Sequence, residues 1–220
     1  MKQVFVVSGG SIQDEFAVRV IEKKQPALLI AADSGMDFFY RNGIQPDVIV
    51  GDFDSVQPDV LAYYKKQSKT EFCELNPIKD DTDTEFAIRL AIARGAEKIM
   101  ILGGTGSRLD HVLGNIELLG IGLEHKVAIE LLDAHNRIRM IEQGLTLLKS
   151  EQFGTYVSLI PYTSEVEGLS LCGFKYPLTN YCLKGFCSLG VSNEITDEEA
   201  VITFDKGILL VIESRDEVYI

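Results

Sequence analysis

The sequence predicts an α/β domain followed by an all-β domain, and three observations support this division. Up to residue 135, short apolar runs alternate with segments of helical periodicity, which is typical of parallel strands covered by helices on both faces. Beyond residue 135, short strand candidates follow one another with turn signals between them and no helical periodicity, as in antiparallel sandwiches. The chain has 220 residues, which is enough for two domains with sizeable cores.

The first part of the chain alternates strand and helix candidates. The strands are predicted at Val4–Val7, Leu28–Ala32, Val48–Val50, Thr70–Leu75, Ile99–Leu102 and Val127–Leu132. The helices are predicted at Asp14–Lys24, Met36–Arg41, Pro58–Lys66, Thr82–Gly95 and Asp110–Leu119. Proline suits the first position of the third helix, and Thr82 with Glu85 forms a capping-box pattern at the start of the fourth.

The second part of the chain contains strand candidates only. They lie at Arg137–Ile141, Thr146–Leu148, Tyr156–Ile160, Leu169–Leu171, Lys184–Ser188, Ala200–Phe204 and Ile208–Ile212. We therefore expect a Rossmann-like parallel sheet in a domain over residues 1–135 and an all-β sandwich over residues 136–220, with no flexible linker between them.

Composition and charge exclude several classes of protein. Asp and Glu number 33 against 21 Lys and Arg, which gives a formal net charge of −12. Such a surface repels nucleic acids and anionic lipids, so we expect neither nucleic acid nor membrane as a partner. The start of the chain lacks the pattern of a signal peptide, and the four cysteines include no C-x-x-C pair. These features predict a reduced cytoplasmic protein.

Acidic side chains follow several strands at one predicted edge of the sheet. Asp33 follows the second strand, Asp52 and Asp54 follow the third, and the loop after the fourth strand holds Lys79 and Asp83. Ligands of open parallel sheets bind beyond the carboxyl ends of the strands. Converging carboxylates repel one another unless a cation neutralises them, and their oxygens suit Mg²⁺ bridged to phosphates. The sequence therefore predicts a site for Mg²⁺ and a phosphate ligand.

A glycine-rich loop, Gly103–Arg108, follows the strand at Ile99–Leu102. Backbone N–H groups at the start of a helix bind phosphate, and Arg108 adds a bidentate donor. The loop matches neither common phosphate-binding motif, because no lysine follows Gly106. We interpret His111 as a structural hydrogen-bonding group, and the spacing of the three histidines makes a zinc site improbable.

Six short motifs occur in order along the chain. They are A-D-x-G at Ala32–Gly35, P-D-x-I-x-G-D-F-D-S at Pro46–Ser55, T-D-T-E at Thr82–Glu85, G-x-x-x-R-x-D-H at Gly104–His111, K-Y-P-L at Lys175–Leu178 and G-V-S-N-E at Gly190–Glu194. Together they resemble the thiamine pyrophosphokinase family over nearly the whole chain. The resemblance implies an enzyme that transfers pyrophosphate from ATP to the hydroxyl of thiamine, giving thiamine diphosphate and AMP. It also implies Mg²⁺ and a homodimer.

Pyrophosphoryl transfer depends on charge neutralisation and in-line positioning more than on covalent chemistry. We therefore predict Asp52, Asp54 and Asp83 as the catalytic carboxylates and Mg²⁺ ligands, with Asp54 or Asp83 accepting the proton of the substrate hydroxyl. Asp33 is a supporting ligand or a nucleotide contact, and Asp110 either orients Arg108 or binds ribose. The predicted nucleotide-binding residues are Asp33, Lys79, Thr105, Ser107, Arg108 and Asp110.

The pattern around Ser192 and Asn193 is equally consistent with a simple hairpin turn. The resemblance implies instead that both residues contact the pyrimidine of thiamine. It further implies that the dimer brings this loop against the nucleotide site of the partner subunit. The alternative is that the two domains of one chain close on each other.

Two departures from the family pattern concern fine contacts to the nucleotide. Ser34 and Asp37 stand where the family often has Gly and Asn, and Ser107 stands where it often has Gly. Two other functions are consistent with some of these residues. One is a haloacid-dehalogenase-like phosphohydrolase with Asp52 as nucleophile, although that motif normally follows the first strand. The other is a non-catalytic nucleotide-binding sensor, which leaves the β-rich second half unexplained.

Overall fold

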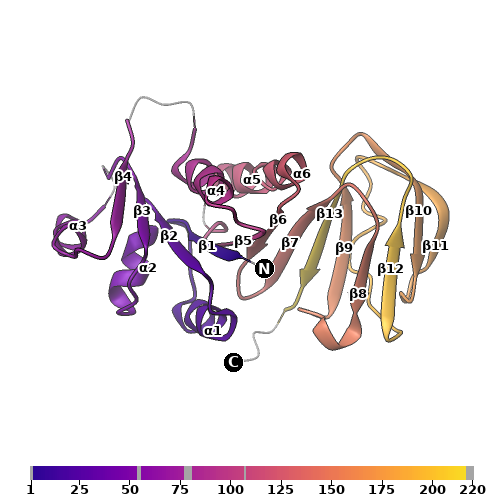
Figure 1. Ribbon diagram of the computed structural model, residues 1–220. Helices are drawn as coiled ribbons and strands as arrows, with labels where there is room; N and C mark the ends of the chain where they lie inside the picture. Colours follow the sequence, from indigo (N-terminus) through magenta and orange to yellow (C-terminus); the bar gives the residue numbers. More distant parts are fainter. Residues whose placement is uncertain (1, 54–55, 77–80, 107, 217–220) are drawn as a thin grey trace. The chain divides into compact units, whose positions relative to one another are not determined.

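The structure is a computed structural model that describes residues 2–53, 56–76, 81–106 and 108–216. The chain forms two compact units, Met1–Ala134 and His135–Ile220. Strands and helices alternate in the first unit, whereas the second consists almost entirely of strands (Figure 1). The predicted fold class, a parallel α/β sheet followed by an all-β sandwich, is confirmed.

The sheet of the first unit has the strand order β4-β3-β2-β1-β5-β6, and each neighbouring pair is parallel. Its strands are β1 (Gln3–Val7), β2 (Leu28–Ala32), β3 (Val48–Gly51), β4 (Glu71–Glu74), β5 (Lys98–Leu102) and β6 (Ala128–Leu132). The central strand is apolar from Val4 to Val7 and completely buried, as expected for a strand covered on both faces.

Helices lie on both faces of this sheet, with α1 and α2 on one face and α4, α5 and α6 on the other (Figure 1). The helices are α1 (Asp14–Lys24), α2 (Gly35–Arg41), α3 (Pro58–Lys65), α4 (Asp83–Ala93), α5 (Leu109–Glu117) and α6 (Gly120–His125). Pro58 is the first residue of α3, as the sequence predicts. The Thr82 hydroxyl accepts a hydrogen bond from the Glu85 backbone N–H at 3.2 Å, which confirms Thr82 as the cap of α4.

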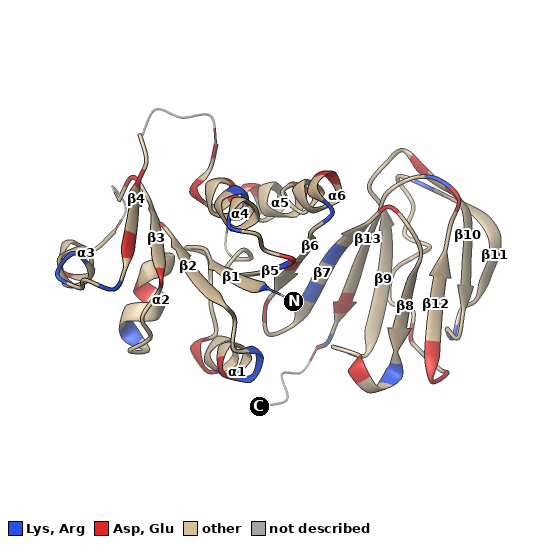
Figure 2. Cartoon of the chain, viewed as in Figure 1, with Lys and Arg blue, Asp and Glu red and all other residues tan. Residues whose placement is uncertain are grey.

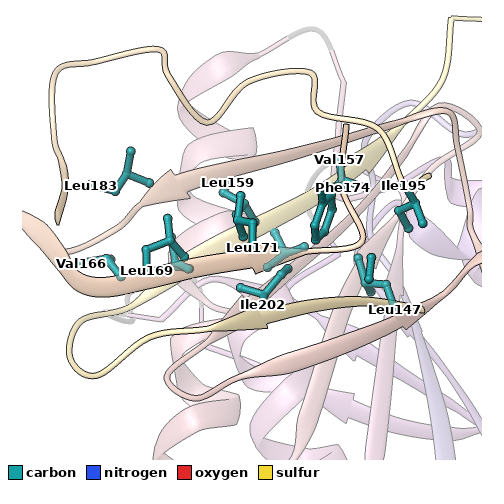
Figure 3. Packing of buried hydrophobic residues seen from close by; sticks show 13 residues of the cluster. Leu147, Val157, Leu159, Val166, Leu169, Leu171, Phe174, Leu183, Ile195 and Ile202 are labelled. Atoms are coloured by element: carbon teal, nitrogen blue, oxygen red, sulfur yellow. The ribbon is translucent and has the colours of Figure 1, made fainter. Parts of the chain in front are cut away.

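The second unit is a sandwich of antiparallel strands. One layer has the order β11-β10-β12-β8, and in the other β13 pairs with β7 and β9. The strands are β7 (Asn136–Ile141), β8 (Leu145–Leu148), β9 (Tyr156–Pro161), β10 (Glu165–Cys172), β11 (Leu178–Lys184), β12 (Glu199–Thr203) and β13 (Leu209–Ser214), and a 3-10 turn, η1, covers Lys149–Glu151. Apolar side chains from the two layers meet in a core that includes Val157, Leu169 and Ile202 (Figure 3).

Two element predictions are wrong. The strand expected at Lys184–Ser188 is absent, because Phe186 has a φ of 61° and a fully exposed side chain, and a strand at Leu178–Lys184 takes its place. The helix expected at Asp110–Leu119 ends at Glu117, and a second short helix follows over Gly120–His125.

A buried charge cluster joins β7 and β13. The Glu213 carboxylate is completely buried and accepts hydrogen bonds from Arg137 Nε at 2.7 Å and Arg137 Nη2 at 2.6 Å. Arg139 donates to the same carboxylate, and so does the Phe153 backbone N–H at 3.1 Å. Figure 2 shows these basic positions on β7 and the acidic one on β13. These donors offset the free-energy cost of removing the Glu213 carboxylate from water.

No helix in the described ranges is long and apolar enough to cross a membrane. All four cysteines are free thiols, and three of them are exposed.

Candidate functional site

The strand order of the first unit places a topological switch point between β1 and β5. From β1 the chain builds β2, β3 and β4 outward on one side, and it then adds β5 and β6 on the other side of β1. Chain connections leave a switch point in opposite directions, so a crevice opens beyond the carboxyl ends of the two strands. The loops that follow β1 and β5, residues 8–11 and 103–106, are therefore the expected walls of a ligand site.

These two loops interlock through backbone hydrogen bonds. The N–H groups of Ser8, Gly10 and Ser11 donate to the carbonyl oxygens of Leu102, Gly103 and Thr105, at 2.8, 2.8 and 3.0 Å. A Cβ at position 10 would overlap the carbonyl oxygens of residues 103 and 105, and one at position 103 would overlap the carbonyl oxygen of residue 8. Glycine is thus required here because the two backbones touch, in addition to the positive φ of 66° at position 103. We call residues 8–11 and 103–106 the glycine clamp.

A cavity of about 530 Å³ lies over the glycine clamp. Its walls come from the loops after β1, β2 and β5, from the first turn of α4 and from the first two turns of α5, all within the first unit. The lining residues are Ser8, Gly9, Gly10, Ser11, Ala32, Asp33, Ser34, Thr82, Asp83, Thr84, Gly103, Gly104, Thr105, Gly106, Arg108, His111, Val112 and Asn115. The lining combines hydroxyls, backbone N–H groups and the Arg108 guanidinium with the carboxylates of Asp33 and Asp83. Such a set suits a phosphate ligand that is bound together with a cation.

Several predicted site residues meet in this cavity. Asp33, Asp83, Thr105 and Arg108 line it, and so does His111. Asp33 comes from the end of β2 and adopts a left-handed conformation with a φ of 48°, which a residue with a short polar side chain tolerates. Asp83 is the first residue of α4, where the positive end of the helix dipole favours a carboxylate.

Asp52 follows β3 directly and is half-buried, but it lies outside the cavity lining. The Asp33 backbone N–H donates to the Val50 carbonyl at 2.7 Å, so the ends of β2 and β3 are held together. Among the described residues no three His, Cys, Asp or Glu side chains form a cluster that could hold a metal ion. Asp54, Lys79 and Ser107 lie outside the described residues.

Arg108 and Asp110 form an exposed bidentate pair. Arg108 Nη2 lies 2.6 Å from one carboxylate oxygen of Asp110 and Nε lies 3.2 Å from the other. This pairing is the main reason that the pKa of Asp110 falls to about 2. Of the two roles predicted for Asp110, orientation of Arg108 is the one that this geometry supports.

The loop after β1 and the side chains that support the clamp were not predicted from the sequence. Asn115 lies one turn beyond His111 on α5, and its Nδ2 donates to the Gly104 carbonyl at 2.7 Å. Ser34 packs against Gly9, where any Cβ would overlap the Ser34 hydroxyl. The glycine pair Gly9-Gly10, one residue after the first strand, was a visible signal for this loop, since such pairs mark close approach of the backbone to another chain segment or a ligand.

Comparisons with known proteins decide the family. A model of the thiamin pyrophosphokinase catalytic domain matches residues 21–131, and a model of the thiamin pyrophosphokinase vitamin B1 binding domain matches residues 144–209. The thiamine pyrophosphokinase of Bacillus subtilis (strain 168) is 33% identical over 216 residues, which cover 98% of this chain and 100% of the relative. The chain belongs to the thiamin pyrophosphokinase family.

Solved structures of the family agree with this assignment. The crystal structure of thiamine pyrophosphokinase from Bacillus subtilis superposes with a TM-score of 0.86 and 33% identity, covering 98% of this chain and 100% of that one. The thiamin pyrophosphokinase from Geobacillus thermodenitrificans gives a TM-score of 0.84 and 30% identity, with 98% of each chain covered. The family and the thiamine pyrophosphokinase activity predicted from the sequence are confirmed.

Ser192 and Asn193, in the vitamin B1 binding domain of the family, form a turn docked on β9. Asn193 is 7% exposed, its Oδ1 accepts from the N–H groups of Tyr176 and Glu194, and its Nδ2 donates to the Tyr176 carbonyl at 2.8 Å. Ser192 is exposed, and its N–H donates to Ser158 Oγ at 3.0 Å. The exposed Ser192 hydroxyl suits a ligand contact better than the Asn193 amide, which the fold uses already. Contact of both residues with thiamine stays a prediction.

Proposed function

We propose that the chain transfers the pyrophosphoryl group of an ATP–Mg²⁺ complex to the hydroxyl of thiamine in the cavity over the glycine clamp. The observation that carries the proposal is that this cavity combines two glycine loops, Arg108 and the carboxylates of Asp33 and Asp83. The hydroxyls of Ser11 and Thr105 and the Arg108 guanidinium offer donors to phosphate oxygens, and the carboxylates offer oxygen ligands to a cation. Products of the reaction are thiamine diphosphate and AMP.

The proposed Mg²⁺ ligands are Asp52, Asp54 and Asp83, with Asp33 in support. Their donor set fits Mg²⁺, which takes carboxylate oxygens and shares the remaining positions with phosphates. A bound Mg²⁺ would neutralise the phosphate charge that a chain of net charge −12 otherwise repels. The hydrogen bond between the ends of β2 and β3 supports a shared role for Asp33 and Asp52.

The remaining residues bind and orient the nucleotide and the substrate hydroxyl. Arg108, held by Asp110, and Lys79 would pair with phosphate oxygens, and the hydroxyls of Thr105 and Ser107 would donate to them. Asp54 or Asp83 would accept the proton of the substrate hydroxyl as it attacks the β-phosphorus. In this scheme no enzyme group is phosphorylated, and His111 keeps a structural role.

The products identify the reaction. Incubating the protein with ATP, thiamine and Mg²⁺ should yield AMP and thiamine diphosphate in equal amounts, as identified by mass spectrometry. A direct transfer also inverts the configuration at a chiral β-phosphorus. Release of inorganic phosphate with a trapped phosphoaspartate at Asp52 would instead favour a phosphohydrolase, and binding of ATP without turnover would favour a sensor. The position of Asp52 after β3 rather than β1 speaks against the phosphohydrolase.

We also propose a homodimer with active sites at the subunit interface. Two exposed apolar patches support it, since exposed clusters of large apolar side chains mark interaction surfaces. On α5, Leu109 and Leu113 are 73% and 63% exposed. In the second unit, Phe186, Leu189 and Val191 are exposed beside Ser192. In a two-fold dimer, the patch on α5 of one subunit and the loop of its partner can cover each other twice.

A mixing experiment tests the shared site. Chains carrying Asp52→Asn and chains carrying Ser192→Ala with Asn193→Ala should each be inactive, with their folding checked by thermal unfolding. After subunit exchange, activity should return up to roughly one competent site in each heterodimer, because one site receives both intact halves. A monomer at working concentration, or a mixture as inactive as its parents, contradicts the shared site.

The cytoplasm is the proposed location of this enzyme, with thiamine and ATP as its small-molecule partners. The four free cysteines support a reducing compartment, and the acidic surface disfavours nucleic acid and anionic membrane.

A further inference from the structure

A pair of hydroxyl groups links the end of β1 to the start of α4. Ser8 Oγ lies 2.8 Å from Thr84 Oγ1, and either oxygen can be the donor. Both residues line the cavity over the glycine clamp, and Ser8 is only 3% exposed. Thr84 directly follows Asp83 in the first turn of α4. A contact at Thr84 therefore acts on the backbone that carries Asp83.

The two partners belong to parts of the unit that are held by different interactions. The Ser8 N–H donates to the Leu102 carbonyl at 2.8 Å, and the Ser8 carbonyl lies against Gly103, so this residue is part of the clamp. α4 packs against β1, β2 and β3 and buries Ala87, Ile88 and Ala91, which lie beyond its first turn, whereas the hydrogen bond from the Glu85 N–H to Thr82 lies within the helix. This packing holds the body of the helix on the sheet and the cap stabilises its first turn, and the hydroxyl pair joins that first turn to the glycine clamp.

We propose that the Ser8–Thr84 pair is a positioning element that fixes Asp83 relative to the glycine clamp. The clamp and Asp83 must hold the phosphates and the cation at the same time, and an error of a few tenths of an ångström between them weakens both contacts. The hydroxyl pair is a side-chain hydrogen bond that joins the two parts directly. This inference rests on the proposed role of Asp83 in the Mg²⁺ site.

Removal of the pair tests this role. Ser8→Ala and Thr84→Val each delete one hydroxyl, and the double variant deletes both without leaving a buried hydroxyl unpaired. Thr84→Ser keeps the hydroxyl and should rescue the contact. Thr196→Val is a control in the second unit, since it removes an exposed hydroxyl that donates to the Gly173 carbonyl or to the Asp197 carboxylate.

The readout is calorimetric titration of Mn²⁺ into protein that holds α,β-methylene-ATP, together with kcat and the KM for ATP. We expect Mn²⁺ affinity to fall roughly two- to tenfold in the double variant, the range for one neutral hydrogen bond, and kcat to fall with it. The double variant should bind Mn²⁺ at least as tightly as the Ser8→Ala variant does, because the two hydroxyls act as one unit. Thr84→Ser and Thr196→Val should bind Mn²⁺ as the wild type does.

The outcomes distinguish failure of the positioning role from failure of the proposed metal site. Wild-type Mn²⁺ affinity and kcat in a folded double variant overturn the positioning role and leave the proposed function intact. A lower melting temperature with unchanged affinity also overturns the positioning role, because it shows a purely structural bond. Wild-type protein that binds no Mn²⁺ in the presence of the nucleotide analogue overturns the metal site and the positioning role together.

Discussion

Replacing Asp52 by Asn should lower the rate of thiamine diphosphate formation by at least about 10²-fold, the usual scale for losing one preorganised charge contact. Asn keeps the shape of the side chain and removes the negative charge, so the loss falls on cation binding and transition-state stabilisation. Asp52 is half-buried directly after β3, and the Val50 carbonyl at the end of β3 accepts a hydrogen bond from the Asp33 N–H. Both observations support this role. Steady-state kinetics at saturating Mg²⁺ measure the effect.

A matched variant shows whether the loss is specific. Asp59 is an exposed carboxylate in the first turn of α3, away from the cavity lining, and Asp59→Asn should keep the wild-type rate. Asp54→Asn should resemble Asp52→Asn. Near-normal turnover of a folded Asp52→Asn protein would remove Asp52 from the Mg²⁺ site.

Replacing Glu213 by Ala should lower the free energy of unfolding by about 3–5 kcal/mol, the range for breaking a buried ion pair from one side. The carboxylate is completely buried and accepts hydrogen bonds from Arg137, Arg139 and the Phe153 backbone N–H. Without it, two partly buried guanidinium groups face each other with no anion between them. Urea unfolding followed by circular dichroism measures the change.

The control for this variant is another strand glutamate. Glu199 lies on β12 with its side chain exposed, so Glu199→Ala should change stability by less than about 0.5 kcal/mol. Similar midpoints for the two variants would mean that the charge cluster contributes little to stability. Turnover of folded Glu213→Ala protein at low temperature should stay close to wild type, since the cluster lies outside the lining of the proposed nucleotide cavity.

Elements with strong local signals were predictable from the sequence. The helix at Asp14–Lys24 has the predicted bounds, because acidic residues begin it, lysines end it and Pro26 follows shortly after it. The buried parallel strands were predictable because they are continuous apolar runs. These signals depend on residues that are neighbours in the sequence.

Elements with mixed signals were not predictable. Strand β11 carries mostly exposed side chains, so its run L-T-N-Y-C-L-K shows little apolar alternation. The apolar residues among Lys184–Ser188 led us to predict a strand there. In the structure Phe186 is exposed and has a left-handed backbone conformation. Pairing with β10 creates β11, and that partner is not visible in the local pattern.

The charged residues of the candidate site were predicted from the sequence, but the loop after β1 was not. Asp33, Asp83 and Arg108 were expected at the carboxyl edge of the sheet and do line the cavity. Ser8 and Gly10 were missed because their role depends on β1 lying beside β5, and strand order is not written in any local segment. The glycine clamp is a consequence of topology.

If ATP binds over the glycine clamp as proposed, the clamp also determines when during synthesis the enzyme can first bind ATP. Its two halves lie far apart in the chain, and the second half follows β5, which a ribosome makes only after it has made β1, β2, β3 and β4. A nascent chain that ends before β5 has one half of the clamp and none of the three backbone hydrogen bonds that join the halves, so it offers no complete nucleotide site. The proposed nucleotide site is therefore complete only in the finished sheet, and we expect ATP to stabilise that sheet selectively by mass action. We therefore expect ATP to stabilise the enzyme against unfolding only after β5 has paired with β1.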